Sequence, residues 1–92
     1  MKSQLISRNI TVNGRRTSMR LEEAAWEAID DICAHEGVSI NDLCTAIDQR
    51  RSTSSRTATV RAFIVTYFRE AVAEAGGLTG GHVNTLIPDF SA

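Results

Sequence analysis

The sequence has few cysteines and no long apolar run, and both shortages narrow the class of protein. Only two of the 92 residues are cysteines, Cys33 and Cys44, too few for the disulfide framework of a small secreted domain. Both lie in apolar stripes at helical spacing, so we expect buried free thiols. No apolar run is long enough to span a bilayer, and the opening MKSQLISRNI lacks the apolar core of a signal peptide. We therefore expect a soluble, cytoplasmic protein.

Residue patterns that carry chemistry are also missing. The cysteines and the two histidines, His35 and His82, have neither the C-x₂-C nor the H-x₃-H spacing of a zinc site. The stretch GGLTGGH lacks the Lys-Ser/Thr pair of a nucleotide-binding loop. Asp30 and Asp31 are adjacent, so on a helix they point about 100° apart and do not converge as catalytic carboxylates do. We expect no metal, no cofactor and no catalytic residue, and hence not an enzyme.

Each of three successive stretches of the chain carries charges of only one sign. Residues 1–20 contain five basic residues and no acid, residues 21–49 contain eight acids and no Lys or Arg, and residues 50–69 contain five arginines and no acid. The formal net charge of −1 conceals this segregation. The basic amino-terminal fifth is a candidate surface for a polyanion. The alternative is an unstructured tail whose charge only keeps it soluble.

The stretch RNITVNGRRTSMRL predicts a hairpin. Asn13-Gly14, which accepts the positive φ angles of a type I′ turn, lies between two alternating runs. Residues 8–12 then fold back on residues 15–21; the alternative is a mobile arm that orders on binding. In the second run, one side of the strand carries Arg16, Ser18 and Arg20, and the other carries Thr17, Met19 and Leu21.

Three helices are predicted after the hairpin. Apolar residues recur at helical spacing over 21–36, which ends at Gly37, and over 39–51, for which Ser39 is a natural N-cap. A third helix over 55–75 has Ser55 as its cap and an apolar band wide enough to predict burial on more than one side. We expect residues 1–7 to be an arm, residues 8–76 one domain and residues 77–92 a tail. A chain this short buries a modest part of its surface, and dimerisation is a common remedy.

The stretch RRTSMRLEEAAWEAIDDICAHEGVSINDL resembles the strand, first helix, glycine turn and capped second helix of the ribbon-helix-helix family of DNA-binding proteins, the type that includes the Arc and MetJ repressors. With its third helix, the chain is similar to a subgroup of short bacterial members. The resemblance implies a mainly α fold with a short N-terminal β-ribbon and an additional C-terminal helix, as an intertwined homodimer in which two chains share the ribbon.

The resemblance also implies site residues. Three alternate outward strand residues read bases in the family, and here these are Arg16, Ser18 and Arg20. Backbone amides at the start of the second helix hold a phosphate, and here that end is Val38, Ser39, Ile40 and Asn41. We also expect phosphate contacts from Arg8 and Arg15.

The function that follows is sequence-specific binding of double-stranded DNA by a dimeric transcriptional repressor or autoregulator, which can assemble further on DNA and has no membrane partner. The alternative is an antitoxin-like or adaptor dimer whose arm, strand or tail holds a partner protein, with the acidic first helix as the recognition surface and with DNA binding secondary or absent.

Two questions stay open. SSRTATVRAFIVTYF also looks like the second helix of the family, with Ser55 as cap and Arg56 and Arg61 near phosphates, which would make residues 39–51 an insertion. Moreover, a hairpin in each chain of a shared ribbon makes four strands, whereas the major groove admits two. Either residues 8–12 are a loose arm that follows the DNA backbone, or the binding is not a standard major-groove dock.

Overall fold

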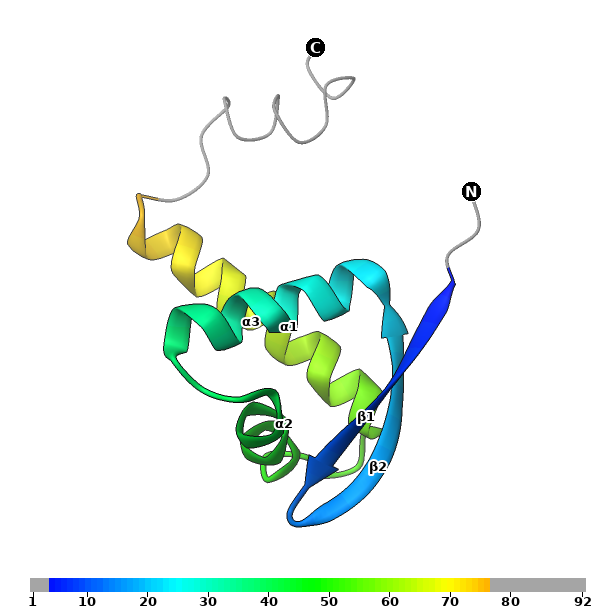
Figure 1. Ribbon diagram of the computed structural model, residues 1–92. Helices are drawn as coiled ribbons and strands as arrows, with labels where there is room; N and C mark the ends of the chain where they lie inside the picture. The colour runs from blue at the N-terminus through cyan, green and yellow to red at the C-terminus, as the bar shows by residue number, and fades with distance from the viewer. Residues whose placement is uncertain (1–3, 77–92) are drawn as a thin grey trace.

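The computed structural model describes residues 4–76, in which a two-stranded antiparallel hairpin is followed by three helices (Figure 1). The strands are β1 (Leu5–Val12) and β2 (Arg15–Glu22), and the helices are α1 (Glu23–Glu36), α2 (Ile40–Asp48) and α3 (Arg56–Glu74). The predicted fold class, mainly helical with an N-terminal β-ribbon and an additional helix, is confirmed. The structure shows one chain, so the intertwined dimer stays a prediction.

The hairpin forms because its turn residues accept left-handed backbone angles. Asn13 has φ 52° and Gly14 has φ 77°, as a two-residue type I′ turn requires. Val12 pairs with Arg15 across this turn, and the ladder continues to Leu5 and Glu22. The predicted hairpin is therefore confirmed, and the mobile-arm alternative is wrong. The strand begins at Leu5, so residues 5–7, which we expected in an arm, belong to β1; the predicted tail at 77–92 lies outside the described residues.

The boundary between β2 and α1 lies two residues later than the sequence pattern predicts. Leu21 was expected to open the helix, but it continues the alternation of β2 and is completely buried, at 0% exposure. The helix begins at Glu23, a carboxylate in the first turn, which the helix dipole favours. It ends at Gly37, whose φ of 70° lets its N–H donate to the Cys33 carbonyl over 2.8 Å.

Both later helices begin at the serines that were predicted as caps. The Ser39 hydroxyl accepts a hydrogen bond from the Asp42 N–H at 3.0 Å, and the Ser55 hydroxyl accepts one from the Ala58 N–H at 3.1 Å. The second helix ends earlier than predicted, at Asp48, so residues 49–51 lie in the connection to α3.

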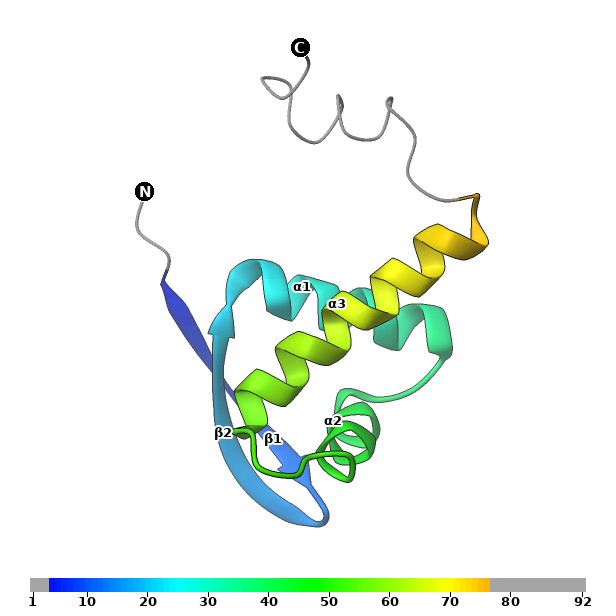
Figure 2. The ribbon, with the colours of Figure 1, turned by 180° about the vertical axis from the view of Figure 1, so that it is seen from behind.

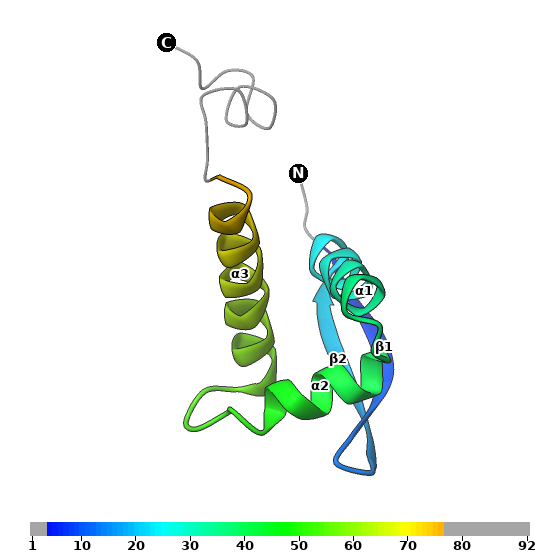
Figure 3. The same ribbon diagram turned by 90° about the vertical axis from the view of Figure 1, so that its left-hand side faces the viewer.

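The core lies between the hairpin and the helices. In Figure 3, α1 and α2 lie on one face of the hairpin, and α3 stands on the side where β2 lies. Seen from behind, α3 crosses α1 (Figure 2). The buried residues come from every element: Ile10, Val12, Met19, Leu21, Trp26, Ile29, Ile32, Leu43, Cys44, Ile47 and Val60.

Two expectations about burial are corrected. The third helix was expected to be buried on more than one side, but Val60 is its one fully buried residue, and Val65 and Phe68 are 59% and 38% exposed. The apolar band of α3 is therefore wider than the side of this helix that packs against the rest of the described chain. Cys44 is buried as expected, whereas Cys33 is half-buried, because it lies at the margin of the stripe that α1 turns toward the core.

Candidate nucleic-acid interface

The hairpin has one face turned to the helices and one turned away from them. Directly opposed residues of an antiparallel pair point to the same side, so the register defines both faces. Met19 and Leu21 lie on the inner face and are buried at 2% and 0% exposure, and Thr17 between them and the turn is half-buried. We call the opposite side the outer face; it consists of four rows, Leu5 with Glu22, Ser7 with Arg20, Asn9 with Ser18, and Thr11 with Arg16.

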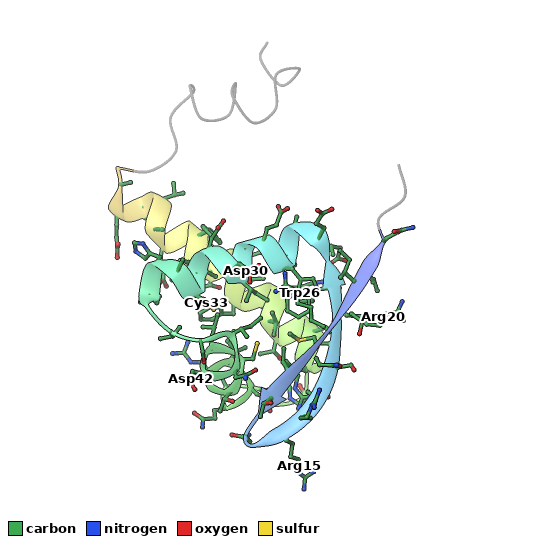
Figure 4. All side chains as sticks on the ribbon, viewed as in Figure 1. Arg15, Arg20, Trp26, Asp30, Cys33 and Asp42 are labelled. Carbon is green, nitrogen blue, oxygen red and sulfur yellow. The ribbon has the colours of Figure 1, made fainter. Side chains whose placement is uncertain are left out.

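The three predicted base-contacting residues all lie on this outer face. Arg16, Ser18 and Arg20 are exposed, and Figure 4 shows Arg20 pointing away from the helices. Among the described residues, neither arginine has a carboxylate within ion-pair distance. The structure thus brings two unpaired guanidinium groups and a hydroxyl together on one surface.

The first strand contributes the other half of this face, which we did not predict from the sequence. Ser7 and Asn9 are exposed there, and Thr11 is half-buried. The Ser18 hydroxyl donates to Asn9 Oδ1 over 3.1 Å and so joins the two strands at the row between those of Arg16 and Arg20. The signal was present, because a two-residue turn at Asn13-Gly14 already determines which residues oppose each other.

Helix α2 closes the edge of β1. Asn41 Oδ1 accepts a hydrogen bond from the Thr11 N–H at 2.9 Å, and Thr45 Oγ1 accepts one from the Asn13 N–H at 3.1 Å. These side chains occupy backbone donors that a further strand would need. The same bonds hold the beginning of α2 beside the hairpin.

The predicted phosphate site at the start of α2 is an exposed helix end with some of its groups already engaged. The Val38 N–H donates to the Cys33 carbonyl at 3.1 Å, and the Ser39 hydroxyl caps the helix. The amides of Ile40 and Asn41 lie in the first turn, where N–H groups have no partner within the helix. These two amides are therefore the groups best able to bind an anion.

Arg8 lies on the inner face rather than on the outer one. Its guanidinium forms two 3.1 Å hydrogen bonds with the carboxylate of Asp30, which raise the arginine pKa further above its ordinary value. It also lies over the Trp26 ring, 4.6 Å from the centroid. These contacts use two of the five N–H donors of the guanidinium, and the predicted phosphate contact of Arg8 stays a prediction.

Arg15 lies at the tip of the hairpin (Figure 4), beside a groove of about 450 Å³. Arg16 and Thr17 also line this groove, and α3 contributes Arg56. The Arg56 Nε donates to Asp48 Oδ1 at 2.9 Å and lowers the pKa of that carboxyl. The groove is thus basic on the side of the strand and neutralised on the side of the helices.

If α3 were the second helix of the family pattern, its cap and its arginines would contact DNA. In the structure these side chains are bonded to other groups of the chain. Ser55 caps α3, Arg56 is paired with Asp48, and Arg61 forms two 3.1 Å hydrogen bonds with the carboxylate of Glu22. These contacts favour the direct interpretation, in which α2 is the second helix of the pattern.

Residues 4–76 contain no cluster of three or more His, Cys, Asp or Glu side chains able to hold a metal ion. No described helix has the length and apolar character needed to cross a membrane.

Comparison with protein-family models gives a match. A family model described as a ribbon-helix-helix domain matches residues 5–68, which include both strands, α1, α2 and most of α3. No curated protein and no solved structure matches the chain.

Proposed function

The chain belongs to the ribbon-helix-helix family, since the family model covers residues 5–68 of 92, and from this premise we propose that it is a sequence-specific DNA-binding regulator. Members of the family are generally DNA-binding transcription regulators or antitoxins. The observation that carries the proposal is the alternation of β2: Met19 and Leu21 are buried, while Arg16, Ser18 and Arg20 are exposed on the opposite face. Charges that served only to prevent edge-to-edge pairing with another strand would not need to form such a regular row of hydrogen-bonding groups.

Base contacts in this proposal come from β2. An arginine can bind O6 and N7 of guanine together in the major groove, and a serine hydroxyl can donate or accept. Arg16 and Arg20 therefore read guanine, and Ser18 contacts the base pair between them.

Phosphate contacts fix the position of the protein on the duplex. The amides of Ile40 and Asn41 bind one phosphate, supported by the Ser39 cap and the neighbouring Val38, and Arg15 at the tip of the hairpin binds another. Arg8 joins them through the N–H donors that Asp30 does not occupy.

We further propose that the protein acts in the bacterial cytoplasm as a homodimeric repressor or autoregulator. The exposed Val65 and Phe68 support a dimer, because they extend the apolar band of α3 beyond what one chain covers. A dimer without a stable monomer melts at a temperature that rises with protein concentration. A concentration-independent melt together with a monomer mass in solution would contradict this part of the proposal.

The DNA-binding proposal is tested on the gene's own upstream DNA and on a scrambled duplex at two salt concentrations. Arg20→Ala should cost about 1–3 kcal/mol on the preferred duplex and reduce its advantage over the scrambled one, because a base contact is lost. Arg16→Ala should act in the same direction. The matched control is Arg69→Ala, an exposed arginine of α3 far along the chain from the hairpin, which should leave the preference unchanged.

The proposal fails if the unmodified protein shows no preference for any duplex. The assignment of the face fails if both β2 variants bind as the unmodified protein does while Arg56→Ala or Arg61→Ala abolishes binding. The third helix would then be the DNA-proximal helix.

A second candidate function has its own observation. An apolar groove of about 330 Å³ lies between α1, α2 and α3, with Ile32, Leu43 and Phe63 in its lining. An antitoxin-like or adaptor dimer would use such a groove, together with the acidic first helix, to hold a partner protein. A toxin-sized neighbouring gene, and a stable complex of the two products without DNA, would favour this function over the first.

A further inference from the structure

We propose that the groove at the tip of the hairpin is a binding site for a small phosphorylated molecule, and that this ligand competes with DNA for the arginines of the tip. The groove is the cavity of about 450 Å³ whose lining includes Arg15, Arg16 and Arg56. The site itself does not depend on the proposed DNA-binding function, whereas the competition rests on that function and deepens it.

Three segments that are distant in the chain meet at this groove. The hairpin tip lines one part of it, the end of α2 contributes Asp48, and the start of α3 contributes Arg56. The Asn13 N–H donates to Thr45 Oγ1 at 3.1 Å and so holds the tip beside α2. Figure 2 shows the start of α3 beside β2. The fold therefore forms the groove from elements that are fixed against one another.

Positive charge exceeds negative charge around the groove. The Asp48 Oδ1 lies 2.9 Å from the Arg56 Nε and 3.1 Å from the Arg51 Nε, so one carboxylate is shared by two guanidinium groups. Arg15 and Arg16 are exposed, and within residues 4–76 neither has a carboxylate at ion-pair distance. Four arginines thus have a single carboxylate among them, which leaves an excess of three positive charges for an anion.

The groove also retains hydrogen-bond donors for a ligand. A guanidinium has five N–H groups, and Arg56 uses the one on Nε for Asp48. Its Nη atoms make no hydrogen bond to other residues of the described part of the chain. The Thr17 hydroxyl and the Asn13 amide add neutral donors to the lining. The planar fork of an arginine matches the spacing of phosphate oxygens.

The start of α3 lacks the negative charge that the other helix starts have. The first turns of α1 and α2 contain Glu23 and Asp42, whereas the first turn of α3 contains no acid. Its first residue is Arg56, and the helix dipole disfavours a cation at this end. An anion in the groove supplies the charge that is missing there.

Size and charge together indicate the class of ligand. A volume of about 450 Å³ lies within the range of about 300–1,000 Å³ that is typical of small-molecule sites, so the groove has room for an organic part beside a phosphate group. A phosphate monoester carries a charge of about −1.5 to −2 at neutral pH and three acceptor oxygens. It therefore matches the excess of positive charge better than a single carboxylate does.

Two arginines of the groove also belong to the proposed DNA interface. Arg16 is a proposed base contact and Arg15 a proposed phosphate contact, whereas Arg56 is bonded to Asp48 and has no part in that interface. A ligand that binds Arg15 and Arg16 occupies donors that DNA needs. Binding of the ligand should therefore release the protein from DNA.

The first test is calorimetric titration of the full-length chain with inorganic pyrophosphate, without DNA and with sodium chloride holding the ionic strength constant. Arg15→Gln and Arg56→Gln should each weaken binding about 10-fold or more, because each removes a charge-assisted pair of donors. Arg15→Gln keeps the test valid if Arg56→Gln is unstable, because Arg15 has no ion pair to lose within the described residues. Arg69→Gln, about 20 Å along α3 from Arg56, is the matched control and should bind as the unmodified chain does.

The second test measures duplex binding in pyrophosphate and in sodium chloride of the same ionic strength. Saturating pyrophosphate should weaken binding of the unmodified chain to its preferred duplex about 10-fold more than chloride does. Arg56→Gln should bind the duplex normally and lose this difference. Equal effects of the two salts on the unmodified chain would refute the competition.

The remaining outcomes separate the site from the function. The site is refuted if Arg69→Gln weakens pyrophosphate binding as much as Arg15→Gln does, since the attraction is then unspecific. It is also refuted if pyrophosphate does not bind while Arg15→Gln and Arg56→Gln weaken binding to every duplex and lower its salt slope by about one each, because the groove then holds a DNA phosphate. Pyrophosphate binding by a chain that prefers no duplex supports the site and refutes the DNA-binding function.

Discussion

Trp26 joins the hairpin to the first helix, and its replacement by phenylalanine should destabilise the protein by about 2–3 kcal/mol. The indole is 1% exposed, and its Nε1–H donates to the Ile6 carbonyl over 2.8 Å. Loss of this hydrogen bond costs about 0.5–1.5 kcal/mol. The smaller ring leaves part of the site unfilled, which costs roughly 1–2 kcal/mol more. The ring lies between α1 and the hairpin, since Trp26 belongs to α1 and its Nε1–H reaches Ile6 of β1.

The same residue is coupled to Arg8, whose guanidinium lies 4.6 Å from the ring centroid. This cation–π contact adds about 0.5–1 kcal/mol, and the half-exposed ion pair of Arg8 with Asp30 adds about 0–1 kcal/mol. Arg8→Met should therefore cost roughly 1 kcal/mol. The loss should be smaller when Trp26 is already phenylalanine, because a phenyl ring attracts a cation less strongly than an indole does.

The assay is urea denaturation at one fixed protein concentration, since the stability of a dimer depends on concentration. The midpoints should shift with an unchanged slope. Arg20→Met is the matched control: it removes an arginine from the outer face instead of the inner one, and its stability should stay within about 0.5 kcal/mol. If Trp26→Phe is as stable as the unmodified protein, or if the effects of the Trp26 and Arg8 changes simply add, the indole does not join the two elements as described.

Three further predictions concern single groups. Ser39→Ala should lower stability by about 1 kcal/mol in urea melts and weaken binding to all duplexes alike, because it removes a cap beside a phosphate contact; sequence-dependent loss would contradict this role. Burial raises the pKa of the Cys44 thiol to about 11, so in the native protein a disulfide reagent should modify the half-buried Cys33 before Cys44. Cys44→Ser should lower the free energy of unfolding by about 1–3 kcal/mol, because it buries a hydroxyl among apolar side chains. The hydrogen bond from Tyr67 to the Glu36 carboxylate, 2.6 Å long, raises the tyrosine pKa to about 12 from 10.0, so this contribution to stability is complete below pH 10 and is lost as the pH rises through 12. Because Tyr67 is the one tyrosine of the chain, its phenolate absorbance reports this shift, and equal titration in the native and urea-unfolded protein would refute it.

The sequence alone determined the features that depend on neighbours in the chain. Asn13-Gly14 requires positive φ angles, so the turn and the register of the hairpin follow from two residues. Ser39 and Ser55 bond to amides three residues away, so both helix starts were predicted correctly. The alternation of β2 likewise placed Arg16, Ser18 and Arg20 on the exposed face, and their contact with DNA stays a prediction.

The tertiary structure decided what depends on residues distant in the sequence. Arg8 was expected to contact phosphate, but Asp30, twenty-two positions later, holds it on the inner face. Arg61 bonds to Glu22 across thirty-nine positions, so of the arginines considered for DNA contact, those on β2 are left without carboxylates among the described residues. Asn9 became part of the outer face because β1 is a paired strand rather than an arm. Such pairings depend on how the elements pack, so the spacing of residues along the chain does not determine which distant carboxylate each arginine contacts.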